Sequence, residues 1–112
     1  MYDNIKIGER PQIEYYKVGG ISMVKLPYET TEVSPGIFSW RELRVRFQNL
    51  NYGGIVSALI DLKYSPSEMT AIINNYLLDP EDNAIKDEFM NMQEYRMYAK
   101  DVAKEIIKEF NL

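Results

Sequence analysis

The chain of 112 residues contains neither cysteine nor histidine. Without cysteine it can form no disulfide bond and offers no thiolate ligand to a metal ion. Histidine is the commonest general base and a frequent transition-metal ligand, so its absence removes Ser–His catalysis and most transition-metal sites. An enzyme built on this chain would have to work with carboxylate, lysine and tyrosine groups alone. We therefore predict that the protein is not an enzyme.

Long apolar runs are also missing. No stretch of about 18 apolar residues is present, so we expect no membrane-spanning helix. The first residues lack the apolar segment of a secretion signal. We therefore expect the protein in a cytoplasm, or in a particle assembled there.

Motifs that bind phosphates or metal ions are absent as well. The two glycine pairs, Gly19-Gly20 and Gly53-Gly54, match neither the dinucleotide fingerprint nor a phosphate-binding loop. The acidic run at residues 79–83 has neither the spacing nor the glycine of a calcium loop, and we interpret it as a helix start. We expect no cofactor-binding and no metal-binding residue.

The clearest pattern that is present is a helical hairpin over residues 65–110. Ser65 and Glu68 form a capping-box signature, with Pro66 at the first helical position. Apolar residues then recur at helical spacing up to residue 78. Asp79-Pro80 ends this helix and starts a second one, which runs to Phe110 without Gly or Pro. The short turn predicts that the two helices pack antiparallel.

The second helix is about twice as long as the first, so its far end needs another cover. We predict that either the N-terminal half of the chain or a second subunit supplies this cover. The apolar stripe of that end makes up our candidate oligomer interface: Tyr95, Ala99, Val102, Ile106 and Phe110.

The N-terminal half is predicted to form a small antiparallel sheet. Residues 1–14 have few apolar groups, and we interpret them as an arm. Strands are expected at 15–18 and 21–26, joined at Gly19-Gly20, with Pro27 ending the second strand. Further strands are expected at 37–40 and 43–47, where apolar and polar residues alternate.

A short helix that is apolar on almost every side follows near residues 55–62. We expect it to lie buried between the sheet and the hairpin. The sequence therefore predicts a single α+β domain over residues 15–112, with a β-rich part at 15–50 and a helical part at 53–112.

Three arginines, Arg41, Arg44 and Arg46, lie close to Trp40. Cations beside an aromatic ring can hold single-stranded nucleic acid, and Trp40, Arg44 and Arg46 are candidate contact residues. A net charge of −4 disfavours nucleic-acid binding, and a solvated strand face is the simpler interpretation. A small cytoplasmic adaptor or regulatory protein with weak nucleic-acid contact through the three arginines remains the alternative function.

Part of the chain resembles small uncharacterised proteins encoded by phages and prophages of gut bacteria. The resemblance covers residues 43–105 and is carried by Ile55-Val56-Ser57-Ala58-Leu59-Ile60, by Lys63-Tyr64-Ser65, and by residues 68–77 with their Asn74-Asn75-Tyr76. It implies a role in a virion or in its assembly, at the tail or the capsid, and no catalytic residue. Our leading hypothesis is a non-enzymatic phage structural protein that self-associates and binds other virion proteins.

Overall fold

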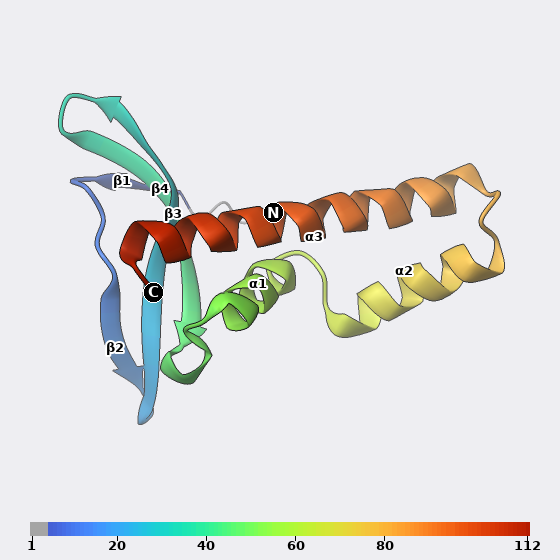
Figure 1. Cartoon of the computed structure of the whole chain (residues 1–112), viewed down its shortest axis with the longest axis horizontal. Helices are drawn as coiled ribbons and strands as arrows, with labels where there is room; N and C mark the ends of the chain where they lie inside the picture. Colours follow the sequence, from blue (N-terminus) through green and yellow to red (C-terminus); the bar gives the residue numbers. More distant parts are fainter. Residues whose placement is uncertain (1–4) are drawn as a thin grey trace.

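The computed structural model describes residues 5–112, which form four strands and three α-helices (Figure 1). In chain order these are β1 (Ile5–Gly8), β2 (Glu14–Val18), β3 (Ile21–Ser34), β4 (Ile37–Arg46), the 3-10 turn η1 (Phe47–Asn49), α1 (Tyr52–Asp61), α2 (Pro66–Leu78) and α3 (Asn83–Phe110). A four-stranded antiparallel sheet followed by helices confirms the α+β prediction.

The sheet has the strand order β1-β4-β3-β2. Residues 5–8 were predicted to belong to an arm, but they form an edge strand in which Ile5 lies opposite Arg41 and Gly8 opposite Phe38. The prediction failed because a strand of four residues is too short to show a pattern of its own and is held by its pairing with β4. Residues 1–4 of the predicted arm lie outside the described residues. Since β1 and β2 are at opposite edges, the segment 9–13 must cross β3 and β4.

The two central strands are longer than predicted. Pro27 was expected to end a strand, yet it lies buried inside β3, opposite Glu42. The ladder becomes irregular directly after Tyr28, where Glu29 has a positive φ of 52°, and such a bulge is a place where a sheet accepts proline. The two strands predicted at 37–40 and 43–47 are one continuous strand, β4.

The helix α1 starts where the Asn51 side chain accepts a hydrogen bond from the Gly54 N–H at 2.8 Å. Its buried side is made of Ile55, Val56 and Leu59. Its other side is open to solvent and ends with exposed Leu62, so the helix is buried on one face and not all round. It contacts α3 and β4, as its apolar face requires.

The capping box at the start of α2 is present. The Glu68 N–H donates to Ser65 Oγ at 3.1 Å, and the Ser65 N–H donates to Glu68 Oε1 at 3.4 Å. The next helix begins later than predicted, because the Asp79 N–H still donates to Asn75 O and closes α2. The chain turns over residues 79–82, and Asp82 is the cap of α3.

The core lies between one face of the sheet, α1 and the second half of α3. It contains Val24, Leu26, Leu43 and Val45 from the sheet, Ile55 and Leu59 from α1, and Ala99, Ala103 and Ile106 from α3. The helix α2 adds little to it: Ile72 is its one buried residue. Figure 1 shows α2 and the first half of α3 projecting from this body, and the described chain measures 50 × 37 × 26 Å.

The projecting helices contact each other. The rings of Tyr76 on α2 and Phe89 on α3 are stacked, with centroids 4.2 Å apart and an angle of 4° between their planes. Among residues 5–112 there is no helix that is both long enough and apolar enough to span a bilayer.

Candidate interaction surfaces

The predicted oligomer seam at the end of α3 is wrong for its three central residues. Ala99, Val102 and Ile106 are 0%, 6% and 1% exposed, because the sheet and α1 cover them within the same chain. Phe110 is half-buried and packs against the same core. Of the two covers that the sequence allowed, the N-terminal half of the chain supplies the one over Ala99, Val102 and Ile106.

Tyr95 is also held inside the chain. Its hydroxyl donates a hydrogen bond of 2.7 Å to the backbone carbonyl of Leu59 in α1. Its ring lies 5.8 Å from that of Tyr64 and 5.6 Å from that of Tyr98. Burial raises the pKa of the Tyr95 phenol above its usual value of 10.0, and the neighbouring Tyr64 raises it further. Tyr95 is therefore a structural residue that joins α3 to α1.

The three arginines do not share one face. Successive side chains of a strand point to opposite faces, so Arg41 lies on one side of β4 and Arg44 and Arg46 on the other. Arg41 pairs with Glu29, with 3.4 Å between Nε and Oε2, next to Tyr28. Arg44 and Arg46 are exposed, and one guanidinium nitrogen of Arg44 lies 3.6 Å from Glu42 Oε1. The predicted nucleic-acid contact therefore loses one of its three cations.

Trp40 is half-buried and is not an open platform for a base. A Cβ atom added at Gly8 would lie 3.5 Å from its ring, so β1 passes close to it. Trp40 also lines a small cavity of about 50 Å³ together with Pro11 and Gln12, which belong to the segment that crosses the sheet. Half of the indole is therefore closed to a stacking base by neighbouring parts of the same chain.

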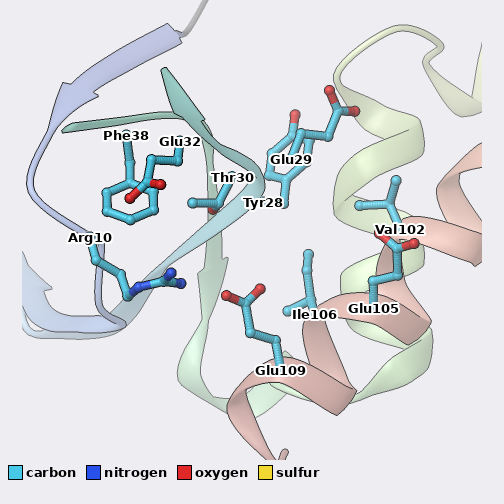
Figure 2. Close-up of a pocket in the computed structure, with 10 residues that line it drawn as sticks. All are labelled: Arg10, Tyr28, Glu29, Thr30, Glu32, Phe38, Val102, Glu105, Ile106 and Glu109. Atoms are coloured by element: carbon cyan, nitrogen blue, oxygen red, sulfur yellow. The ribbon is translucent and has the colours of Figure 1, made fainter. Parts of the chain in front are cut away.

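An acidic cavity of about 330 Å³ opens between the sheet and the end of α3 (Figure 2). Four carboxylates line it, from Glu29, Glu32, Glu105 and Glu109, and its apolar wall includes Phe38 and Ile106. Arg10 stacks on the Phe38 ring with its guanidinium carbon 4.5 Å from the centroid. Figure 2 shows Arg10 reaching in from the sheet side and Glu109 from the helix.

The cavity has the chemistry of a pocket for a cationic group, since carboxylates accept hydrogen bonds from ammonium or guanidinium. Arg10 is a cation of the chain itself that already lines it. No three acidic side chains within residues 5–112 are grouped so that they could hold a metal ion.

Two surfaces that the sequence did not single out lie at the far ends of the molecule. The first is the hairpin tip, which we define as residues 77–88. Leu77 and Leu78 are 71% and 85% exposed there. Leu77 falls in the apolar run predicted for the first helix, but it lies at the end of α2, away from the core, and is exposed. Leu78 does not fit the spacing of three and four residues that defines the apolar face of this helix. This misfit was the one sequence signal that Leu78 would be exposed.

The second surface is the sheet-end cleft, a hollow of about 290 Å³ at β2. Tyr15, Tyr16, Met23 and Phe47 form its apolar lining, and Lys17 also lines it. The rings of Tyr15 and Phe47 are 6.2 Å apart and are 62% and 56% exposed. Residues so far apart in the sequence meet only after β2, β3 and η1 have folded, so no local pattern could reveal the cleft.

Comparison with known proteins adds no identity: no protein family, no curated protein and no solved structure matches this chain.

Proposed function

We propose that the protein is a non-enzymatic assembly component of a bacteriophage particle, which self-associates and binds other virion proteins. The observation that carries the proposal is the projecting pair of helices with Leu77 and Leu78 uncovered at its tip. Two adjacent leucine side chains that stay in water do not stabilise a monomer. An exposed apolar patch of this kind is typical of a surface that binds another protein.

The resemblance of residues 43–105 to small phage and prophage proteins supports the choice of a virion over other assemblies. The particle is assembled in the cytoplasm of the bacterial host, and the protein remains in it, at the tail or the capsid. The seam proposed at Ala99, Val102 and Ile106 is no part of this function, since these residues are core.

Two measurements test the proposal. Sedimentation velocity of the full chain over a range of micromolar concentrations is expected to show species larger than the monomer. Mass spectrometry of particles purified from the source bacterium is expected to find the chain at a fixed ratio to the major virion proteins. A clean monomer at all concentrations, together with particles that lack the chain, would contradict the proposal.

The adaptor with nucleic-acid contact is the weaker candidate. Arg41 pairs with Glu29 on the other face of β4, and Trp40 is half-buried. No observation on the molecule favours this function over assembly.

A further inference from the structure

The hairpin tip and the sheet-end cleft lie at opposite ends of the long axis, as Figure 1 shows for α2 and β2. We infer that they bind each other between copies of this chain, so that the tip of one copy docks in the sheet-end cleft of the next. This inference rests on the proposed self-association and adds its geometry: a head-to-tail contact.

Shape is the first argument. The tip presents two adjacent leucine side chains at the end of the projecting helices, and both side chains are largely exposed. The cleft offers a hollow of about 290 Å³ with aromatic and methionine walls. Apolar side chains in a preformed apolar hollow are the usual centre of a protein interface, with polar groups around them.

Charge is the second argument, and it selects the partner. The tip carries five acidic residues and one basic residue, a net charge of −4. Its acidic residues are Asp79, Glu81, Asp82, Asp87 and Glu88. Two tips brought together would repel each other, because like charges across an interface oppose association.

The cleft carries the opposite sign. Lys17 is the one charged residue among those that line it. Arg46 is opposite Met23 in the ladder, and the Lys25 ammonium lies 5.1 Å from the centre of the Tyr16 ring. Glu14 Oε2 lies 3.7 Å from Lys25 Nζ and offsets part of this positive charge. An acidic tip with an apolar end therefore meets an apolar cleft that has cations beside it.

The consequence for assembly follows from symmetry. A contact between two different surfaces of the same chain is heterologous, so every copy keeps one tip and one cleft for further partners. Such a contact produces a closed ring or an open chain of copies. The smallest closed ring is a reciprocal dimer, in which each copy places its tip in the cleft of the other.

The test uses two full-length variants, each with one surface removed. The tip variant is Leu77→Ser with Leu78→Ser. The cleft variant is Tyr15→Ser with Phe47→Ser. All four side chains are more than half exposed, so both variants are expected to fold, which circular dichroism checks. A matched control is Val33→Ser, which removes an equally exposed apolar side chain from the far end of β3.

Each species is measured by sedimentation velocity at equal concentration. The wild type and the Val33→Ser control are expected to form species larger than the monomer, and these should be lost at high salt, where the charges are screened. Each of the two variants alone is expected to be a monomer. Their equimolar mixture is expected to form a 1:1 dimer and nothing larger, because one tip and one cleft remain between the two chains.

The other outcomes overturn the inference in distinguishable ways. If the cleft variant still dimerises alone, the contact joins two tips; if the tip variant does, it joins two sheet ends. If the mixture of two folded monomeric variants does not dimerise, the tip and the cleft do not bind each other. In all three cases the proposed self-association survives, whereas a monomeric wild type contradicts the inference and the self-association together.

Discussion

At the scale of single residues, Tyr28 and Tyr95 bring two phenol groups into the region where the sheet meets α3. Burial raises the pKa of both above the usual value of 10.0; the nearby cation Arg41 lowers each pKa by a smaller amount. A buried phenol resists ionisation because its charged form loses the solvation of water.

The raised pKa values predict how stability depends on pH. The unfolded chain ionises these phenols near pH 10, whereas the folded chain ionises them only at higher pH, so their contribution is complete below pH 10 and is lost as the pH rises above it. Thermal unfolding measured between pH 8 and pH 12 should show a falling midpoint only above about pH 10. In the same range, ultraviolet absorbance should show two tyrosines that titrate later than the rest. Simultaneous titration of all tyrosines would contradict the burial of these two.

The hydrogen bond from Tyr95 to Leu59 gives a second prediction. Tyr95→Phe removes the donor at 2.7 Å but leaves the Leu59 carbonyl its bond from the Leu62 N–H at 3.3 Å. The free energy of unfolding should therefore fall by about 0.5–1.5 kcal/mol, the usual net worth of one hydrogen bond. Chemical denaturation measures this loss. Tyr98→Phe is the matched control, since this neighbouring ring is 41% exposed, and it should change stability by less than Tyr95→Phe does.

At the scale of single elements, the start of α1 depends on a close approach of two backbone segments. A Cβ atom at Gly54 would clash with the carbonyl of Asn49, while a Cβ atom at Gly53 would meet only the Asn51 side chain at 3.7 Å. The Gly54 N–H also donates the capping bond to Asn51. The two neighbouring glycines therefore have different roles, although the sequence presents them as an equivalent pair.

This difference predicts opposite results for two similar variants. Gly54→Ala should destabilise the domain by about 1–3 kcal/mol, because backbone has to move to relieve the clash. Gly53→Ala should leave stability unchanged or raise it by less than about 1 kcal/mol, because alanine is the better helix former. Denaturant midpoints of the two variants compare them directly, and equal losses for both would show that the helix start is placed wrongly.

Local signals predicted the helices better than the strands. The capping box at Ser65 and Glu68 is a contact within one turn, so the sequence shows it completely. The start of α3 was misplaced by three residues because Asp79 and Asp82 are both good caps, and Asp79 is used to end α2 instead. The edge strand β1 was missed because it depends on β4, some thirty residues away.

At the scale of the whole molecule, buried residues are distributed unevenly along α3. Between Ala99 and Ile106 the helix has four buried residues, whereas its first half has only Met92, and α2 has only Ile72. The helices are therefore firmly attached to the domain at one end and depend on each other at the other end.

This gradient predicts the pattern of amide hydrogen exchange. Amides of residues 66–90 should exchange through local opening, faster than those of residues 99–106, which should need global unfolding. Mass spectrometry or nuclear magnetic resonance of the protein in heavy water measures the difference. Under concentrations where copies associate, residues 77–88 should become slower. Uniform protection along α3 in the monomer would contradict a weakly held tip.

The sequence by itself determined the elements with local causes: the capped helices, the apolar stripe on α3, and the hairpin of β2 and β3 around Gly19-Gly20. It also showed that this apolar stripe has to be buried, either by another part of the chain or by a second subunit. Only the tertiary structure decided that the sheet and α1 provide the cover, so that Ala99, Val102 and Ile106 are core while Leu77 and Leu78 stay exposed. The physical reason is that helical periodicity reports which face of an element is apolar, whereas the partner of that face is chosen by pairing between segments distant in the sequence, which no local pattern records.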